Sequence, residues 1–250
     1  MTFTECELVK KAGADSGWSI VESESKETIV LGSAAHDKRV SISCTEFEID
    51  AEFDSEINAD ELSCVGPLDV CGKTIAIRNR DYDTLRLALK RMQELFVALP
   101  PAPIEIYNKR WKKLVEGGLD ATETVESVKQ RVGQDVYRET QEKYWKSACA
   151  VTGCAVPETL RASHAKPWAD CESAEERLNV YNGFLLVANL DALFDKGLIT
   201  FDDDGLLLVA SSIPEKDRAA LGLAPGLRLR WIDERHLPFL KYHREHVWRG

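Results

Sequence analysis

The chain lacks the cysteine patterns of disulfide-rich and zinc-binding proteins. Its 250 residues include seven cysteines, an odd number, and no pair has the Cys-x-x-Cys spacing. A disulfide framework is therefore disfavoured, and reduced thiols are the simpler interpretation. Cys149 and Cys154 flank a Thr-Gly turn, but only Cys171 lies near them in the sequence. A structural zinc site with four ligands is disfavoured for that reason.

Long apolar segments are also missing. No apolar run reaches about 18 residues, and no charged-then-apolar leader opens the chain. We therefore expect a cytoplasmic protein with no membrane partner. Hydrophobic residues make up 44% of the chain, which is enough for an ordinary packed core in one large or two modest domains.

The chain also has no excess of basic residues. The 32 Lys and Arg against 42 Asp and Glu give a net charge of −10, whereas proteins that hold DNA by its phosphates usually have a basic surface. The acidity is uneven: residues 1–102 carry 11 basic and 19 acidic groups (−8), residues 103–168 carry 11 and 9 (+2), and the remainder carry 10 and 14 (−4). Any binding to DNA should be weak and strongly salt-sensitive.

Proline and strand-like alternation divide the chain into two expected domains. The Pro-rich stretch 99–103 cannot continue a helix, so we place a domain at 1–100 and a second at 104–250. Apolar and polar residues alternate in segments 27–33, 39–44, 46–53 and 73–78, which predicts strands, and 82–99 has helical spacing. Beyond 103, helices are expected at 104–115 and 123–145, and a hairpin joins 198–201 to 206–209. The predicted fold class is α+β.

Residues 160–195 contain the densest group of chemically useful side chains. Residues 160–164 look like a strand, and 184–187 look like a second strand just after the Asn182-Gly183 turn. Asn189 is expected to be the N-cap of a short helix. That helix carries Asp191 and Asp195, which are four residues apart and share one face.

These residue types suit hydrolysis of a phosphodiester with the help of a metal. Such a reaction needs a neutral base, a hard cation on the phosphate and a group that orients the base. His164 is the candidate base because its ordinary pKa lies near neutrality. Asp191 and Asp195 are candidate oxygen ligands for Mg²⁺ or Mn²⁺. Asn182 would hold the imidazole or tie the two strands together.

Several segments resemble one known family. They are Cys149-Ala-Val-Thr-Gly-Cys154, Leu160-Arg-Ala-Ser-His-Ala-Lys-Pro-Trp168, Glu176-Arg-Leu-Asn-Val-Tyr-Asn-Gly-Phe-Leu-Leu186 and Asn189-Leu-Asp-Ala-Leu-Phe-Asp-Lys-Gly-Leu-Ile-Thr-Phe201, with weaker likeness in 129–138 and 242–248. Together they resemble the HNH endonucleases, specifically the bacterial restriction-endonuclease-like branch, over roughly residues 120–250. The resemblance implies a C-terminal ββα-metal finger that cuts double-stranded DNA, with a role in restriction or defence.

Carried over residue by residue, the resemblance gives His164 the place of the general base and Asn182 that of the middle Asn. Asp191 stands where the signature has its last His, nine residues after that Asn. Ser163 stands where many relatives have an Asp or His ligand. A carboxylate still binds a hard cation, so these departures favour Mg²⁺ or Mn²⁺ over Zn²⁺ or Ni²⁺.

The basic residues around this region are candidate nucleic-acid contacts: Lys129, Arg131, Arg138, Arg161 and Lys166. Each could equally belong to a solvated surface with Glu partners. Individually, the site residues also have ordinary interpretations, since a His beside a Trp is commonly structural and Asn-Gly commonly only a turn. A catalytically inactive HNH-like module that binds nucleic acid or protein therefore remains the alternative hypothesis.

The role of residues 1–100 has two interpretations. Trp18 with Lys73, Arg78 and Arg80 could read a DNA sequence or a modified base, although the net charge of −8 opposes this. The domain could instead form a homodimer interface or bind a protein partner, since cutting both strands with one site per chain generally requires two chains.

Overall fold

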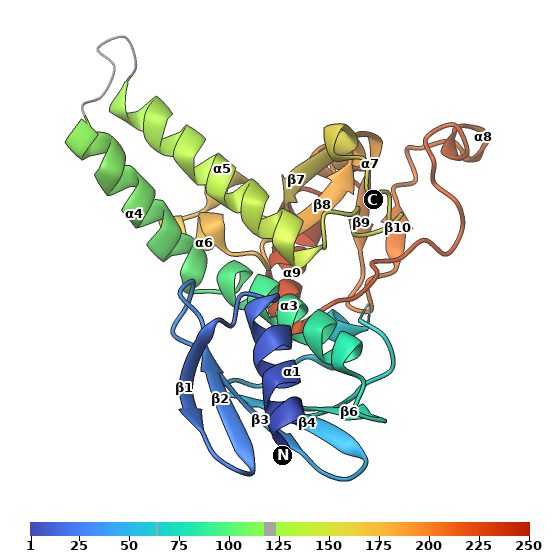
Figure 1. Cartoon of the computed structure of the whole chain (residues 1–250). Coiled ribbons are helices and arrows are strands. Elements are labelled where there is room, and N and C mark those ends of the chain that lie inside the picture. The colour runs from blue at the N-terminus through green and yellow to red at the C-terminus, as the bar shows by residue number, and fades with distance from the viewer. Residues whose placement is uncertain (64, 118–123) are drawn as a thin grey trace. The chain divides into compact units, whose positions relative to one another are not determined.

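The computed structural model describes residues 1–63, 65–117 and 124–250, which form two compact units, Met1–Val97 and Ala98–Gly250 (Figure 1). The first unit is built around a sheet, and the second is helical at its start and mixed beyond. The predicted α+β class, with a β-rich N-terminal part and a helical middle, is confirmed. Within the described ranges, every helix is too short or too polar to cross a bilayer.

An antiparallel six-stranded sheet forms the first unit, in the order β1-β2-β3-β4-β6-β5. The elements of this unit are α1 (Phe3–Ala14), β1 (Ile20–Glu24), β2 (Thr28–Gly32), β3 (Arg39–Cys44), β4 (Glu48–Phe53), α2 (Ala59–Leu62), β5 (Asp69–Cys71), β6 (Thr74–Arg78) and α3 (Tyr82–Ala98). Figure 1 shows α1 lying against this sheet.

Strand alternation explains why helices cover only one face of the sheet. Leu31 pairs with Val40 in the register of β2 and β3, and both are fully buried, whereas Val30 and Ser41 beside them are only half-buried. The buried side chains meet α3, where Phe96 contacts Phe53 with ring centroids 6.0 Å apart. Apolar packing between the sheet and its helices therefore forms the core of this unit.

Trp18 belongs to that core. It is fully buried, and its indole N–H donates to the Leu89 carbonyl over 2.9 Å. This burial disfavours the interpretation that Trp18 helps to read a DNA sequence or a modified base. Two of the three basic groups proposed with it are paired, since Arg78 lies 2.7 Å from Asp69 and Arg80 forms an ion pair with Glu5.

Four elements of this unit, α1, β1, α2 and β5, were not indicated by the sequence. Helix α1 begins after Thr2, whose hydroxyl accepts from the Glu5 amide while the Glu5 carboxylate accepts from the Thr2 amide. This capping box satisfies two amide groups that a helix start leaves unpaired. Strand β1 is exposed along its whole length, so it has no alternating pattern to detect.

The second unit opens with two helices and continues into short strands and helices. Its elements are α4 (Ala102–Gly117), α5 (Val125–Tyr144), β7 (Leu160–His164), α6 (Ala174–Leu178), β8 (Gly183–Val187), α7 (Ala188–Asp195), β9 (Ile199–Phe201), β10 (Leu207–Val209), α8 (Glu215–Arg218) and α9 (Leu237–His246), with 3₁₀ turns η1 (Pro157–Thr159), η2 (Trp168–Asp170) and η3 (Glu234–His236). Strands β9 and β10 form the expected antiparallel hairpin.

Helices α4 and α5 are joined by the bidentate Arg110–Glu139 pair, at 2.8 and 2.7 Å. Helix α4 begins at Ala102, with Pro103 in its first turn, where a missing N–H costs nothing. The expected start of the next helix at Glu123 lies outside the described residues, and α5 is described from Val125 with Thr124 as its N-cap.

Candidate active site

Two antiparallel strands and a helix form the framework of the candidate site. Strand β7 pairs with β8 from Leu160 opposite Val187 to His164 opposite Gly183, and α7 follows β8 without a connecting loop. Because the strand leads directly into the helix, the N-cap position falls on Val187, which has no side-chain cap. The expectation that Asn189 is the N-cap is therefore wrong. Asn189 lies inside α7, and its amide donates to the Leu221 carbonyl over 2.9 Å.

The first residue of β8 must be a glycine. Gly183 has φ +149°, and a Cβ placed there would lie 1.9 Å from the Ser163 carbonyl oxygen and 2.4 Å from the Tyr137 hydroxyl. Since real Cβ atoms do not approach other atoms so closely, only glycine allows the two strands and α5 to meet at this point. The glycine of the Asn-Gly pair is therefore required at the point where β8 begins against β7 and α5.

Ser163 and the two aspartates of α7 come together on one side of β7. The Ser163 hydroxyl donates to Asp195 Oδ1 over 3.1 Å. Burial raises the pKa of Asp191, and the nearby Asp195 charge raises it further, while a hydrogen bond from Ser163 opposes both effects. Burial also raises the pKa of Asp195. Two neighbouring carboxylates whose pKa values are raised are costly to ionise together. With the Ser163 hydroxyl they offer only oxygen ligands, and a hard cation would compensate their negative charge.

His164 lies on the other side of the same strand. Its imidazole stacks on the Tyr137 ring of α5, with centroids 3.7 Å apart and planes 21° apart. Ala162, two residues earlier, packs against the cluster that contains Tyr137. Alternation along β7 thus directs Ala162 and His164 towards α5, and Ser163 between them towards α7.

Hydrogen bonding fixes the protonation of the His164 ring. Nε2 lies 2.8 Å from the backbone oxygen of Arg177, and a carbonyl can only accept. Nε2 therefore carries the hydrogen, and Nδ1 keeps its lone pair in the neutral ring. Burial lowers the pKa of His164 to about 4, with the Arg177 carbonyl opposing the shift. The imidazole is consequently neutral at pH 7, as a general base must be.

Residues from both sides of β7 border one cavity at the His164 end of the strand. A cavity of about 340 Å³ is lined there by Ser163, His164, Asp195, Lys196 and His243, among others. His164 and Asp195 therefore border one cavity, although His164 points towards α5 and Asp195 lies on α7 at the opposite face of the strand. Within the described residues, no group of three or more His, Cys, Asp or Glu side chains is arranged to hold a metal. A cation at the aspartates would depend on water and phosphate oxygens for its other ligands.

Asn182 is fully buried and holds the loop that follows β7. Its side-chain oxygen accepts from the Lys166 amide over 2.8 Å, and its nitrogen lies 3.2 Å from the Lys166 carbonyl and 3.3 Å from that of Glu176. Of the two roles expected for Asn182, these contacts fit the tie between backbone segments. The imidazole of His164 is oriented by Tyr137 and Arg177 instead.

Tyr137 was not recognised as a site residue from the sequence. Its hydroxyl donates to the Asn182 carbonyl over 2.9 Å and accepts from Gln141 Nε2 at 3.0 Å. The Gln141 amide also donates to the Val180 carbonyl over 2.7 Å. The family likeness in 129–138 includes Tyr137 without giving it a role, and the i, i+4 spacing of Tyr137 and Gln141 shows a shared helical face without showing what covers it.

His243 was likewise missed. It stacks on Phe194 with centroids 3.9 Å apart, and its Nε2 lies 3.1 Å from the Phe194 carbonyl. Its Nδ1 then accepts from the Thr200 hydroxyl at 2.9 Å. With both nitrogens engaged, His243 anchors α9 to α7 and β9 beside the cavity.

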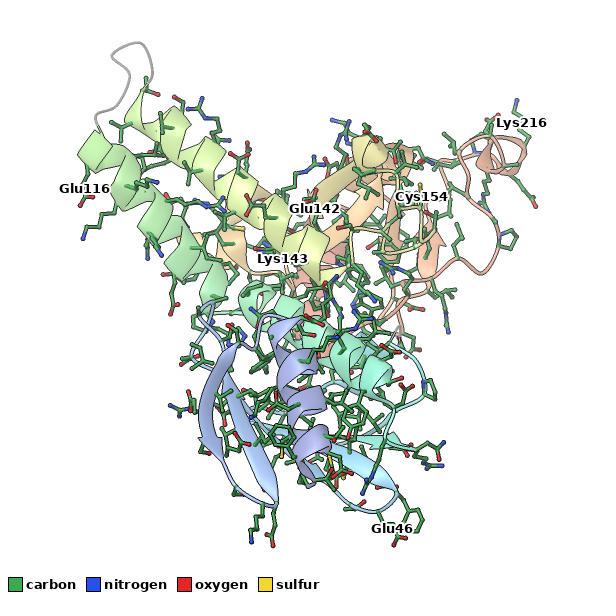
Figure 2. All side chains as sticks on the ribbon, in the orientation of Figure 1. Glu46, Glu116, Glu142, Lys143, Cys154 and Lys216 are labelled. Carbon is green, nitrogen blue, oxygen red and sulfur yellow. The ribbon has the colours of Figure 1, made fainter. Side chains whose placement is uncertain are left out.

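The five candidate nucleic-acid contacts occupy different environments. Lys166 lies 2.7 Å from Glu176, and Arg138 lies 2.9 Å from Glu142, which is labelled in Figure 2. Arg161 donates to the carbonyls of Glu158 and Leu160 while remaining exposed. Lys129 lies over the Trp111 ring at 5.2 Å, and Arg131 is exposed on α5. Lys166 and Arg138 therefore have the Glu partners that a solvated surface would provide.

The cysteines near the site make separate local contacts. Cys149 Sγ accepts from the Thr152 amide at 3.4 Å, and Cys154, labelled in Figure 2, lies 3.9 Å from the Thr159 hydroxyl. Cys171 Sγ accepts from Asn182 at 3.3 Å. Cys64 lies outside the described residues.

Comparison with known proteins agrees with this geometry. Residues 149–202 match a family model described as HNH endonuclease. The matched segment contains β7, β8, α7 and β9, and therefore all four predicted site residues. No curated protein is similar enough to this chain to count as a match.

Proposed function

We propose that this protein is a metal-dependent endonuclease that cuts double-stranded DNA, because residues 149–202 match a family model described as HNH endonuclease. The observation that carries the proposal is the cavity shared by His164 and Asp195, with a neutral imidazole on one side and the Asp195 carboxylate on the other. We further propose a role of the restriction or defence type, which would place the protein in the cytoplasm.

In this proposal His164 is the general base. Its Nδ1 takes a proton from the attacking water, and the positive charge then formed on the ring is shared with the Arg177 carbonyl through Nε2–H. The stack on Tyr137 keeps the ring in one orientation throughout. The return of the proton to solvent is easy because a site with so low a pKa releases it readily.

Asp191 and Asp195 would hold Mg²⁺ or Mn²⁺, with Ser163 in contact with the second carboxylate. When bound, the cation supplies charge neutralisation on the phosphate. Asn182 acts as a positioning residue, because it fixes the backbone of Lys166 and so the loop that borders the cavity. Lys129, Arg131, Arg138, Arg161 and Lys166 are proposed as weaker contacts with the nucleic acid.

One observation favours the alternative of a catalytically inactive binding module. His164 points from β7 towards α5, whereas the aspartates lie on α7 at the opposite face, and the position before His164 is a serine whose hydroxyl is already bound to Asp195. If that arrangement does not open to admit a cation, the segment would bind nucleic acid or protein without cutting.

Residues 1–100 are proposed to have an accessory role. Trp18 is buried, and Arg78 and Arg80 are paired with acidic residues, which favours oligomerisation over DNA reading. A homodimer would supply the two sites that cutting of both strands requires.

A plasmid-nicking assay tests the proposal. The wild type, incubated with Mg²⁺ or Mn²⁺, should convert supercoiled plasmid to the open circular form, and EDTA should abolish the reaction. His164→Ala should lose about 10²- to 10⁴-fold in rate, as expected for a general base. His246→Ala, at an exposed histidine of α9, is the matched control and should cut normally. Equal cutting by His164→Ala and wild type would show that the assignment is wrong.

A further inference from the structure

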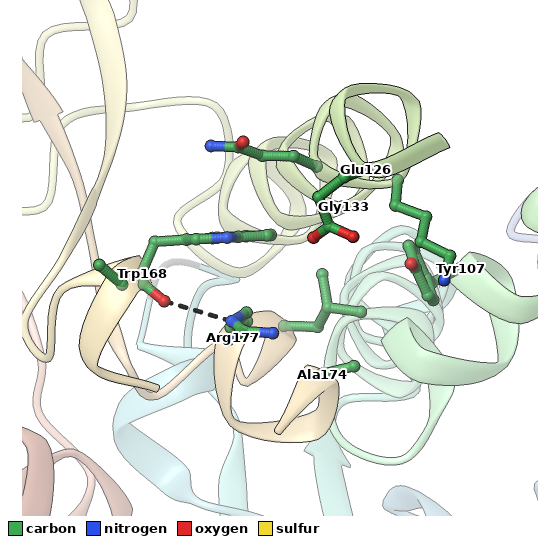
Figure 3. Close-up of a pocket in the computed structure, with 10 residues that line it drawn as sticks. Tyr107, Glu126, Gly133, Trp168, Ala174 and Arg177 are labelled. Carbon is green, nitrogen blue, oxygen red and sulfur yellow. Dashed lines mark hydrogen bonds between the residues drawn. The ribbon is translucent and has the colours of Figure 1, made fainter. Parts of the chain in front are cut away.

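A second cavity lies on the α5 side of β7, next to the candidate active site. Its volume of about 500 Å³ is in the range of small-molecule binding sites. Side chains from α4, α5, η2 and α6 line it, including Tyr107, Glu126, Lys129, Trp168 and Arg177 (Figure 3). None of these side chains takes part in the activation of water proposed above.

Trp168 forms an aromatic wall of this cavity and is held from two sides. Arg177 Nε donates to the Trp168 carbonyl over 3.2 Å, the dashed line in Figure 3, and its guanidinium carbon lies 5.8 Å from the indole centroid. On α5, a Cβ at position 133 would lie 2.6 Å from Trp168 Cη2. The absence of a side chain at Gly133 therefore lets the indole lie directly against the helix.

The remaining walls carry hydrogen-bonding groups and a second aromatic ring. Burial raises the pKa of Tyr107, and the Glu126 carboxylate nearby raises it further. Gln130 contributes an amide, and Lys129 contributes a cation. Aromatic faces combined with a carboxylate and an amide suit a planar heterocycle with polar edges, and the cations suit an attached phosphate.

The cavity adjoins the candidate base through two contacts. The Trp168 indole meets the His164 ring edge-on, with centroids 5.5 Å apart, and the Arg177 backbone accepts the His164 hydrogen bond. A nucleic-acid strand with one phosphate at His164 would therefore bring a neighbouring nucleotide to the opening of this cavity. Because paired bases are stacked in a duplex, only an unpaired or extruded base could enter.

We propose that this cavity binds one unstacked nucleobase of the strand whose phosphate lies at His164. The Glu126 carboxylate accepts hydrogen bonds, so bases with an exocyclic amino group, such as cytosine, are preferred over thymine. The inference rests on the proposed function, because it takes the ligand to be the nucleic acid that the site cuts.

Fluorescence anisotropy in EDTA tests the inference without any cutting. The probes are three fluorescein-labelled duplexes of the same sequence: fully paired, with one bulged cytosine, or with one bulged thymine. Wild-type protein should bind the cytosine bulge about tenfold more tightly than the paired duplex, and the thymine bulge more weakly than the cytosine bulge. Tyr107→Ala should abolish the preference for a bulge, and Glu126→Ala should abolish the preference for cytosine.

Two further variants make the comparison specific. Gly133→Ala adds a methyl group that must displace Trp168, so it should reduce bulge binding without changing any charge. Glu116→Ala, at an exposed carboxylate of α4 outside the cavity, is the control for Glu126→Ala and should match the wild type. Circular dichroism of each variant confirms that a lost preference does not reflect unfolding.

Equal binding of paired and bulged duplexes by the wild type would overturn the inference, as would an unchanged preference in folded Tyr107→Ala and Gly133→Ala. Plasmid nicking, scored separately, distinguishes this failure from failure of the proposed function. A protein that nicks but shows no cavity-dependent preference refutes base binding and remains a nuclease. A protein with the preference but no nicking supports base binding and contradicts the nuclease assignment.

Discussion

The Nε2 atom of His164 lies 2.8 Å from the backbone oxygen of Arg177, and this contact determines how the histidine can act. The carbonyl selects the neutral tautomer with the lone pair on Nδ1, and burial lowers the pKa to about 4. The imidazole is thus unprotonated at neutral pH, with its lone pair on Nδ1. Its orientation comes from a backbone atom of α6 and from Tyr137 of α5, which are both distant from it in the sequence.

Removal of either aspartate charge should weaken metal binding. Asp191→Asn and Asp195→Asn should each lower the affinity for Mn²⁺ by at least about tenfold, measured by isothermal titration calorimetry. Without metal, Asp191→Asn should leave stability unchanged or slightly higher, because burial and Asp195 already disfavour the Asp191 charge.

Asp204→Asn is the control for that experiment, since Asp204 lies in the turn of the β9–β10 hairpin and should have no effect. Unchanged Mn²⁺ affinity in both site variants would remove these carboxylates from the proposed metal site.

A side chain at position 183 should disrupt the hairpin. Gly183→Ala would bring its methyl group against the Ser163 carbonyl and the Tyr137 hydroxyl, and we expect a loss of more than about 3 kcal/mol in the free energy of unfolding. Gly153→Ala also has positive φ, at +70°, but meets no atom within 4 Å, so it should cost only about 1–2 kcal/mol. Urea denaturation of both variants measures the difference, and equal losses would contradict the close approach.

Acid should destabilise the second unit through its buried histidines. His236 is fully buried, and burial lowers its pKa from an ordinary 6.5 to about 4. Between these values the unfolded chain binds more protons than the folded one, so stability falls as the pH falls from 6.5 to 4. The loss from this residue is up to about 3 kcal/mol. The raised pKa values of Asp191 and Asp195 act in the opposite direction.

The slope of unfolding free energy against pH isolates the contribution of His236. His236→Phe keeps a ring against Phe184, on which the imidazole stacks, and should have a shallower slope between pH 6.5 and 4 than the wild type. His246→Phe, at an exposed position, should keep the wild-type slope. Identical slopes in wild type and His236→Phe would show that His236 does not titrate with the expected shift.

The local elements of the site could be predicted from the sequence because they depend on short-range signals. Alternation gave the strand 160–164, and the Asn182-Gly183 pair marked the turn before the second strand. Asp191 and Asp195 share a face of α7, as their spacing indicated. The same signals failed at Asn189, because a strand that leads directly into a helix leaves no separate capping residue.

What covers each face of β7 could not be predicted. Alternation alone requires Ser163 and His164 to point to opposite sides, but it does not show that α7 lies on one side and α5 on the other. Tyr137 and Arg177 orient the imidazole through tertiary contacts, a ring stack and a backbone carbonyl, that leave no periodic pattern. His164 and Asp195 therefore border a common cavity at the end of the strand, although the side chains of His164 and Ser163 point to opposite faces of β7.

The most direct test is a crystal structure with Mn²⁺ soaked in and the anomalous signal measured. We predict a peak bound by the carboxylates of Asp191 and Asp195, with His164 Nδ1 within reach of the ion through one water molecule. A peak elsewhere, or an imidazole too far from the aspartates for one water to join them, would contradict the proposed active site.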